Sequence, residues 1–306
     1  MAEFAAFRTF ENSNVPQSDH VALHPALSAE RFAARPFLRW AGGKSRLLPA
    51  ILPHLPEKFA NYHEPFLGSG AVFFAVRPRP AKHFFLSDLN EDLINIWLVV
   101  RDQPQQFHKA LKKYVGKNFE SDYYLVRDGI VPREMVARAA WFFYLNQTAW
   151  NGLWRVNRWG VFNVPWGDRP FRSIELDTLR YLSTALCGIS IELADFRASL
   201  QRTKAGDLVY LDPPYLPISD TSKFSGYTER RFRAPDLEEL SECCRELTKK
   251  GVYWVLSNRD NPLMRRLFAH ARIIPFTTRR SVAAQNRRNI QPKESPEVII
   301  IGAASP

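Results

Sequence analysis

Short apolar runs alternate with longer mixed segments along most of this 306-residue chain, beginning at Phe37. The short runs predict strands at residues 59–64, 83–88, 189–194, 208–211, 252–257, 272–276 and 297–302. The longer segments predict helices at residues 44–54, 69–77, 89–101, 134–147, 174–185, 235–250 and 261–269. Apolar strands that alternate with helices are typical of an α/β fold with a doubly wound, Rossmann-like sheet, here of mixed strand direction.

The predicted elements are unevenly spaced, and the gap indicates an insertion. Residues 37–101 hold two strands with their helices, and residues 186–306 hold the other strands. Residues 102–185 are rich in aromatic residues and arginine, and contain several turn signals that end in glycine. We expect a mainly helical inserted module there, with a hairpin or loop near 154–168. Residues 1–36 lack firm periodicity and are expected to form an N-terminal extension.

The net charge of +11 is accompanied by 22 Phe, 10 Tyr and 8 Trp, which favours a nucleic-acid partner. Cations neutralise phosphates, and aromatic rings stack on bases. Cys187, Cys243 and Cys244 lack metal-ligand spacing, and no histidine pair is spaced for zinc, so no metal is expected. The odd, scattered cysteines predict a cytoplasmic protein. There is no apolar run of 18 residues and no secretory signal, so no membrane association is expected.

Asp212-Pro213-Pro214-Tyr215 directly follows a predicted buried strand, at the sheet edge where open α/β folds bind ligands. An exocyclic amine is a poor nucleophile because its lone pair is delocalised into the ring. A carboxylate and a main-chain carbonyl that accept its N–H hydrogens can localise that lone pair. The prolines fix φ and hold the carbonyls, while the tyrosine offers a face to a planar base. The alternative is a plain turn after a strand.

A candidate cofactor site is the turn Gly68-Ser69-Gly70, which lies between a predicted strand and an apolar helix. Glycine lets the backbone approach a ligand closely at such a turn. Asp88 ends the next predicted strand, where a doubly wound fold binds a ribose diol. The dinucleotide pattern G-x-G-x-x-G fails at Phe73. This favours S-adenosylmethionine, which has a ribose and an adenine but no phosphates.

A further glycine-bearing turn lies between Trp40 and Lys44. Its functional interpretation is that Lys44 pairs with a carboxylate and that Trp40 covers the cofactor. Taken alone, the segment favours a packed tryptophan and a solvated lysine.

Together these separated motifs, in this order, resemble those of the Dam-type DNA adenine-N6 methyltransferases, the D12 class with the alpha ordering of motifs. The resemblance covers nearly all of residues 37–302. It rests on FLRWAGGK at 37–44, EPFLGSG at 64–70, SDLNEDLI at 87–94, YLNQTAWNGLWRVNRWGVFNVPWG at 144–167, DPPY at 212–215 and LSNRD at 256–260. It implies a site-specific bacterial or phage enzyme that transfers a methyl group from S-adenosylmethionine to N6 of an adenine flipped out of double-stranded DNA. No obligate protein partner is evident.

The resemblance also assigns domains and site residues. Residues 37–101 and 186–306 would form the catalytic domain, and residues 102–185 the target-recognition domain. The residues that would contact S-adenosylmethionine are Trp40, Lys44, Glu64, Phe66, Gly68, Gly70, Asp88 and Asp212. Those that would contact the flipped adenine are Asp212, Pro213, Pro214 and Tyr215. Those that would contact DNA are Arg39, Gln147, Trp150, Asn151, Arg155, Asn163 and Pro165.

Within this DNA set, Trp150 matches the aromatic residue that wedges into the duplex, and Arg155 matches an arginine that recognises a base. Gln147 departs from the family pattern, since relatives that methylate GATC have an arginine there. Glutamine recognises adenine where arginine recognises guanine, so we expect a related short site with one altered position.

Other basic and loop residues follow the DPPY motif. The arginines at 230–233, 279–280 and 287–288 are expected either to contact phosphates or to form a solvated surface. Ser225, Gly226 and Tyr227 are expected to close over the adenine.

Two other functions stay open. One is methyl transfer to another amine, such as cytosine N4, an RNA adenine or a glutamine amide. The other is a DNA-binding homologue that no longer methylates. Asp212 and the inserted module favour DNA adenine over the first alternative, and the intact Tyr215, Lys44 and Asp88 count against the second.

Overall fold

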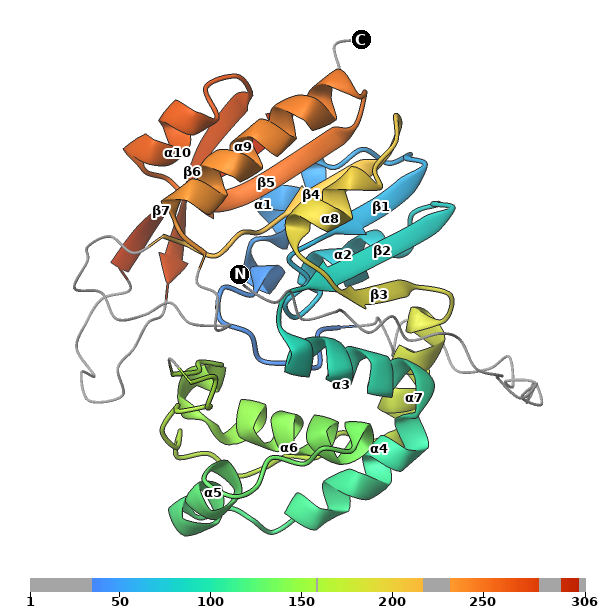
Figure 1. Cartoon of the computed structure of the whole chain (residues 1–306), viewed down its shortest axis with the longest axis vertical. Helices are drawn as coiled ribbons and strands as arrows, with labels where there is room; N and C mark the ends of the chain where they lie inside the picture. Colours follow the sequence, from blue (N-terminus) through green and yellow to red (C-terminus); the bar gives the residue numbers. More distant parts are fainter. Residues whose placement is uncertain (1–34, 158, 217–231, 281–292, 303–306) are drawn as a thin grey trace, which may run out of the picture. The chain divides into compact units, whose positions relative to one another are not determined.

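The computed structural model describes residues 35–157, 159–216, 232–280 and 293–302. They include one seven-stranded sheet with the order β3-β2-β1-β4-β5-β7-β6 (Figure 1). The strands are β1 (Asn61–Glu64), β2 (His83–Asp88), β3 (Ser190–Leu193), β4 (Leu208–Leu211), β5 (Tyr253–Arg259), β6 (Arg272–Arg280) and β7 (Lys293–Gly302). All seven predicted strands are confirmed. The predicted extension at residues 1–36 lies outside the described residues except for its last two.

The strand directions confirm the predicted doubly wound, mixed sheet. Strands β1 to β5 are parallel, and β7 runs antiparallel to both β5 and β6. From β1 the chain builds the sheet toward β3, and from β4 it builds toward the opposite edge. The order therefore reverses between β1 and β4. Such a reversal leaves a ligand-binding crevice at the carboxyl ends of the two strands.

Alternate residues of the central strands face two different cores. In β4, Leu208 and Tyr210 belong to one core, and Val209 and Leu211 belong to the other. The first core is covered by α1 (Leu48–Ile51), α2 (Ala71–Val76) and α3 (Glu91–Asp102). The second is covered by α8 (Phe196–Gln201), α9 (Ala234–Lys249) and α10 (Pro262–Leu267). Burial on both faces explains why β4 is a continuous apolar run in the sequence.

The predicted helix at 44–54 is wrong as a single element. It consists of three short pieces, η1 (Lys44–Arg46), α1 and η2 (Leu52–His54). Pro49 and Pro53 lie in the first turns of the second and third pieces. Proline has no N–H to donate and cannot continue a helix that precedes it, which accounts for the breaks.

Between α3 and β3, a group of helices packs around α6 (Met135–Thr148), in which ten of 14 residues are buried. The others are α4 (Pro104–Leu111), η3 (Lys112–Tyr114), α5 (Glu120–Arg127) and α7 (Leu176–Leu186). The first core continues from the sheet through α3 into α6, so the described residues form one compact unit. Every described helix is too short or too polar to cross a lipid bilayer.

After α6 and η4 (Trp150–Gly152) the chain folds back on itself, as predicted for a hairpin or loop near 154–168. Antiparallel bridges join Ala149 to Trp166 and Val156 to Phe162. The rings of Trp154 and Phe162 pack against each other with their centroids 4.5 Å apart. We call residues 149–167 the 149–167 hairpin.

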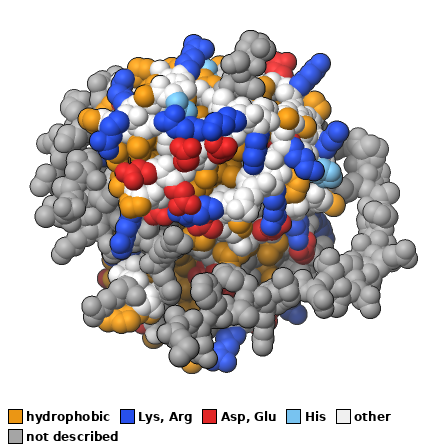
Figure 2. All heavy atoms as spheres, turned by 45° about the horizontal axis from the view of Figure 1, so that its top comes forward, with side chains coloured by type: hydrophobic (Ala, Val, Ile, Leu, Met, Phe, Trp, Pro, Cys, Tyr) orange, Lys and Arg blue, Asp and Glu red, His pale blue; other side chains and the backbone are white. Residues whose placement is uncertain are grey.

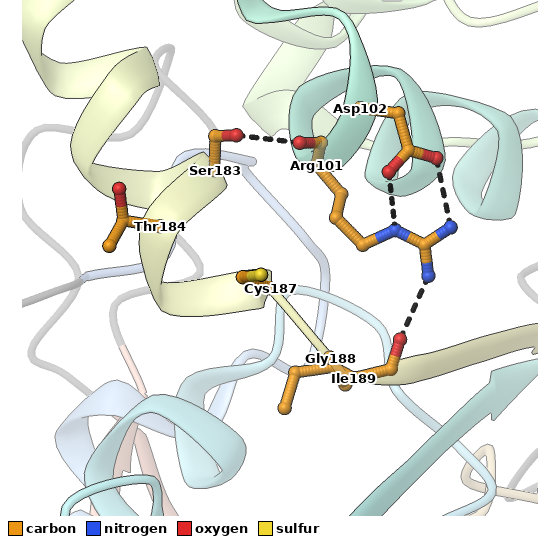
Figure 3. Close-up of a pocket in the computed structure, with 7 residues that line it drawn as sticks. All are labelled: Arg101, Asp102, Ser183, Thr184, Cys187, Gly188 and Ile189. Carbon is orange, nitrogen blue, oxygen red and sulfur yellow. Dashed lines mark hydrogen bonds and ion pairs between the residues drawn. The ribbon is translucent and has the colours of Figure 1, made fainter. Parts of the chain in front are cut away.

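The chain returns to the sheet where α7 ends beside the last turn of α3 (Figure 3). Arg101 pairs with Asp102 through two hydrogen bonds of 2.7 and 2.8 Å and donates to the carbonyl oxygen of Ile189 at 2.8 Å. Ser183 donates to the carbonyl oxygen of Arg101 at 2.6 Å. These residues, with Thr184, Cys187 and Gly188, line a pocket that contains none of the predicted site residues.

Candidate functional site

Three carboxylates meet at the carboxyl ends of neighbouring strands. Glu64 ends β1, Asp88 ends β2, and Asp212 directly follows β4. β1 lies between β2 and β4 in the sheet. The charge of Asp212 acts on both Glu64 and Asp88, so the three side chains share one environment. This convergence follows from the topology, because parallel strands end at the same edge of a sheet.

Lys44 is the cation of this cluster. Its Nζ lies 2.5 Å from Oδ1 of Asp212 and 2.8 Å from the carbonyl oxygen of Gly42. The Lys44 side chain is only 4% exposed, so the solvated lysine that the segment alone favoured is wrong. A tight turn explains the burial. The Gly43 N–H donates to the carbonyl of Trp40 at 3.0 Å, and Gly42 has φ +82°, which brings the chain back into the crevice.

The loop after β1 closes around Asp88. The main-chain N–H of Gly68 donates to Oδ2 of Asp88 at 3.0 Å, and that of Asn90 donates to Oδ1 at 3.0 Å. Gly68 has φ +49°, and a Cβ atom there would lie 2.7 Å from Cδ1 of Trp40. Glycine is therefore required both by the backbone conformation and by the close approach of the indole. We refer to Trp40, this loop and Asp88 together as the cradle, and a side chain at Gly68 would collide with its indole.

Burial changes the ionisation of two of the acids. It raises the pKa of Glu64 to about 8, which the hydrogen bond from the Tyr62 hydroxyl to Oε2 at 2.6 Å only partly offsets. Burial also raises the pKa of Asp88 to about 6, against the main-chain hydrogen bonds that it accepts. The charge of Asp212 adds to both shifts. Near neutral pH Glu64 is mostly protonated, so the crevice can gain negative charge when a cation binds.

Replacing Glu64 by glutamine is expected to stabilise the protein increasingly as the pH rises. The folded pKa of about 8 lies above the ordinary 4.5, so the unfolded chain releases this proton more readily. The stability that Glu64 contributes is therefore fully present below pH 4.5 and is lost as the pH rises through about 8. Glu64→Gln keeps an acceptor for Tyr62. Its melting temperature should exceed that of the wild type by a margin that grows up to about pH 8 and then levels off. A margin independent of pH would contradict this account.

The tetrapeptide after β4 is held by side chains from other strands. Asn258 Nδ2 donates to the carbonyl oxygen of Pro213 at 3.0 Å. The Tyr215 hydroxyl donates to Oε2 of Glu297 at 2.8 Å. The ring centroid of Tyr215 lies 5.2 Å from Nζ of Lys44, beside the ion pair. Pro213 is buried, whereas Pro214 and Tyr215 are half-buried.

Sequence reasoning did not select Asn258 or Glu297 as site residues, although both carried a signal. Asn258 lies within the LSNRD motif, and Glu297 is an acid at the start of the apolar run 298–301. An acid beside a buried strand suggests a partner inside the protein, because a buried charge without one is costly.

Phe66 completes the predicted cofactor set. It is half-buried and stacks on Phe196, with ring centroids 5.6 Å apart, and it meets Phe232 edge-on at 6.1 Å. The structure thus gathers all eight predicted cofactor residues around the same end of the sheet.

The residues predicted to bind DNA lie in or beside the 149–167 hairpin. The main-chain N–H of Trp150 donates to the carbonyl of Pro165 at 2.9 Å. Arg155 donates from Nε to Oδ1 of Asn163 at 2.8 Å and from an Nη to the Asn163 carbonyl at 3.2 Å. Asn151 is exposed and has φ +52°. Trp150, the predicted wedge, is half-buried against the core, whereas the side chain of Trp159 is 68% exposed.

Arg39 and Gln147 lie at the base of this hairpin. Asn146 accepts the main-chain N–H of Arg39 at 2.9 Å and also donates to the Arg39 carbonyl. Gln147 donates to Oδ1 of Asn146 at 3.4 Å. A Cβ atom on Gly152 would lie 2.5 Å from Cβ of Arg39, so the hairpin packs directly on the Arg39 segment. These contacts bring the glycine-bearing turn and the hairpin together.

Several other predictions concern residues, or side chains, that the structure does not describe. Ser225, Gly226, Tyr227 and the arginines at 230–231 and 287–288 lie outside the described residues, as do the side chains of Arg279 and Arg280. On the face shown in Figure 2, basic side chains lie beside acidic ones over the described part. Among the described residues, no group of three or more His, Cys, Asp or Glu side chains could hold a metal ion.

Comparison with known proteins places this arrangement in a family. Residues 40–282 match the model of the family described as D12 class N6 adenine-specific DNA methyltransferase. The Type II methyltransferase M1.LlaDCHI of Lactococcus lactis subsp. cremoris is 35% identical over 269 residues, which cover 85% of this chain and 93% of that protein. The DNA adenine methylase of Escherichia coli (strain K12) is 31% identical over 253 residues, covering 82% and 90%.

Two further similar proteins come from other organisms. The Type II methyltransferase M.MjaIII of Methanocaldococcus jannaschii is 36% identical over 245 residues, covering 74% of this chain and 85% of that protein. Among solved structures, a putative methyltransferase from Thermoplasma acidophilum matches with a TM-score of 0.36 and 8% identity, covering 85% of this chain and 74% of that one.

Proposed function

The chain belongs to the D12 class of N6 adenine-specific DNA methyltransferases, and we propose that it transfers a methyl group from S-adenosylmethionine to N6 of an adenine flipped out of duplex DNA. The observation that carries this proposal is the meeting of Asp212 and the Pro213 carbonyl with the Gly68 loop and Asp88. An acceptor pair beside a nucleoside cradle is what alkylation of an exocyclic amine requires.

The cradle suits S-adenosylmethionine. The Asp88 carboxylate suits a ribose diol, and Gly68 leaves the loop without a side chain where the ligand approaches. Trp40 offers an aromatic face, and Glu64 can ionise to balance a cationic ligand. S-adenosylmethionine, when bound, supplies a methyl group that is activated by its positively charged sulfur.

The residues that follow β4 would then carry out catalysis. Asp212 and the Pro213 carbonyl accept the two N–H hydrogens of adenine N6, which localises the lone pair on nitrogen. Lys44 holds the Asp212 carboxylate through Oδ1. Tyr215 provides the face on which the base stacks. Transfer leaves N6 with one proton fewer, and Asp212 can accept that proton or pass it to water.

The target adenine must first leave the duplex, which costs a few kcal/mol. We propose that residues 102–185 form the target-recognition domain and that the 149–167 hairpin enters the DNA. Trp150 would support the opened duplex and Asn151 would lie beside it. The side chain and carbonyl of Asn163 orient the Arg155 guanidinium, so its planar fork is prepared for a base edge before DNA binds.

Arg155→Ala is expected to weaken binding to the cognate duplex by about 1–3 kcal/mol, while binding to unrelated DNA changes less. The reason is that a base contact contributes only at the correct sequence. Arg180→Ala is the matched control, since Arg180 is an exposed arginine of α7 outside the hairpin. Fluorescence anisotropy at one salt concentration measures both. An equal loss in the two variants would mean that Arg155 contributes only charge.

Recognition is proposed to differ from GATC because Gln147 replaces an arginine of the GATC-methylating relatives. Expression in a host without adenine methylation, followed by single-molecule sequencing of its genome, tests both function and site. The proposal predicts N6-methyladenine in one short sequence that differs from GATC at one position. Clean GATC methylation would refute the altered site, and an unmethylated genome would count against the function.

The two alternatives make different predictions. An enzyme for another amine would label cytosine, RNA or protein rather than DNA adenine when supplied with isotopically labelled S-adenosylmethionine. A DNA-binding homologue without activity would bind duplex but give no heat with S-adenosylmethionine in calorimetry. The buried Lys44–Asp212 pair favours an active enzyme, because a chain released from catalysis has no reason to keep a charged pair in the crevice.

A further inference from the structure

Two buried polar side chains support the DPPY segment from strands that lie beyond β4. Asn258 is the second-last residue of β5, and Glu297 lies in β7, which pairs with β5. Their side chains are 3% and 1% exposed. Neither residue belongs to the predicted cofactor, adenine or DNA sets.

The contacts of Asn258 define its orientation. The main-chain N–H of Arg259 donates to Oδ1 of Asn258 at 2.8 Å, so the Nδ2 end faces the Pro213 carbonyl at 3.0 Å. Glu297 accepts the Tyr215 hydroxyl through Oε2, while Oε1 accepts the hydroxyl of Ser295 at 3.3 Å. Both polar groups are thus held in one orientation by a second hydrogen bond.

The DPPY segment needs such external support. Pro213 and Pro214 have no N–H, so main-chain hydrogen bonds donated by these two residues cannot fasten the segment to the sheet. Strand β4 ends at Leu211, one residue before the segment. The direction of the Pro213 carbonyl is therefore set by whatever donates to it, and in the structure that donor is Asn258.

Stability alone does not explain these two residues. Their strand neighbours Val255, Leu256 and Val298 are buried and apolar. Burying an amide or a carboxylate among such residues is unfavourable unless each is hydrogen-bonded, and an apolar side chain would fill the space at lower cost. Asn258 binds the Pro213 carbonyl and Glu297 binds the hydroxyl of the Tyr215 ring, and the proposed methyl transfer would use both that carbonyl and that ring.

We propose that Asn258 and Glu297 are positioning residues for methyl transfer, and this rests on the proposed function. Asn258 fixes the Pro213 carbonyl, which keeps a second lone pair for the N6–H of adenine. Glu297 fixes the Tyr215 ring through its hydroxyl. Neither side chain touches the substrate. Because a displacement of about 1 Å can cost about 10²-fold in rate, fixing these two groups has a large effect on turnover.

The kinetics of Asn258→Ala and Asn258→Asp test the proposed role of Asn258. Both remove the donor to Pro213, and the aspartate keeps the size and the acceptor for the Arg259 N–H. We expect kcat to fall about 10–100-fold, with S-adenosylmethionine affinity within about two-fold and a cooperative melting transition retained. Ser257→Ala is the matched control. Ser257 precedes Asn258 in β5, is buried, and its hydroxyl bonds to Tyr210 instead of the DPPY segment. Its kcat should stay within about three-fold of the wild type.

The proposed role of Glu297 is tested by comparing a conservative substitution with an apolar one. Glu297→Gln keeps an acceptor for the Tyr215 hydroxyl and should retain most of the turnover, whereas Glu297→Leu should lose about ten-fold or more in kcat. Unchanged kcat in both Asn258 variants would overturn the inference. So would a loss of kcat that Ser257→Ala reproduces or that tracks the loss of cofactor affinity. A wild-type protein without adenine methylation would instead refute the proposed function, before any variant is compared.

Discussion

Asp212→Ala is expected to lower turnover by at least about 10²–10³-fold, the range found when one preorganised group that stabilises developing charge is removed. The variant loses the carboxylate that would accept an N6–H, while the 149–167 hairpin is untouched. Binding to duplex DNA should therefore stay close to that of the wild type. Transfer of labelled methyl groups to duplex DNA measures the first quantity, and anisotropy measures the second.

The variant also leaves the buried Lys44 ammonium without its carboxylate. Breaking a buried ion pair costs about 3–5 kcal/mol, and the lower end is expected because the Asp212 side chain is 20% exposed. The double variant Asp212→Ala with Lys44→Met separates the two effects. It should regain stability but not turnover. If the double variant also regained turnover, Asp212 would act through folding and the catalytic role would be wrong.

Gly68→Ala is expected to reduce S-adenosylmethionine affinity by at least about ten-fold, by analogy with the rate cost of a displacement near 1 Å. It should also destabilise the fold by about 1–3 kcal/mol through backbone strain. The new Cβ would lie 2.7 Å from Cδ1 of Trp40, at a residue with φ +49°. Either the indole or the loop must move, and the N–H that donates to Asp88 moves with the loop. Calorimetry with S-adenosylmethionine and thermal unfolding measure the two effects.

Gly116→Ala is the matched control for the effect of backbone strain on stability. Gly116 has φ +85°, and apart from Gly116 and its two chain neighbours no described heavy atom lies within 4 Å of the Cβ position. This variant should lose about 1 kcal/mol of stability with unchanged cofactor affinity. Equal effects of the two substitutions on cofactor affinity would show that the cradle around Gly68 does not bind the ligand.

The centre of the sheet was predictable because β4 (Leu208–Leu211) and residues 298–301 of β7 are short apolar runs. The helices that sequence reasoning missed, α4, α5 and α8, have eight, eight and six residues. Such lengths give only about two turns of periodicity at most, and short helices are stabilised by packing against neighbours more than by their own sequence. The prolines that divide the predicted helix at 44–54 were visible in the sequence and should have ended it earlier.

The meeting of Glu64, Asp88 and Asp212 was predictable, since each follows or ends a strand of a parallel sheet. The contacts of Asn258 and Glu297 were not, because the first depends on β5 pairing with β4 and the second on β7 inserting beside β5. Local patterns do not encode strand order. The burial of Lys44 was missed for a similar reason, as its carboxylate partner lies 168 residues away.

The central claim is that the acceptor pair after β4 directs methyl transfer to adenine N6 in duplex DNA. The most direct test is to incubate the purified protein with duplex DNA and S-adenosylmethionine, digest the DNA to nucleosides and identify the product by mass spectrometry. The account predicts N6-methyldeoxyadenosine, formed by the wild type and absent with Asp212→Ala. Methylated cytosine, or N6-methyldeoxyadenosine formed equally by both proteins, would contradict it.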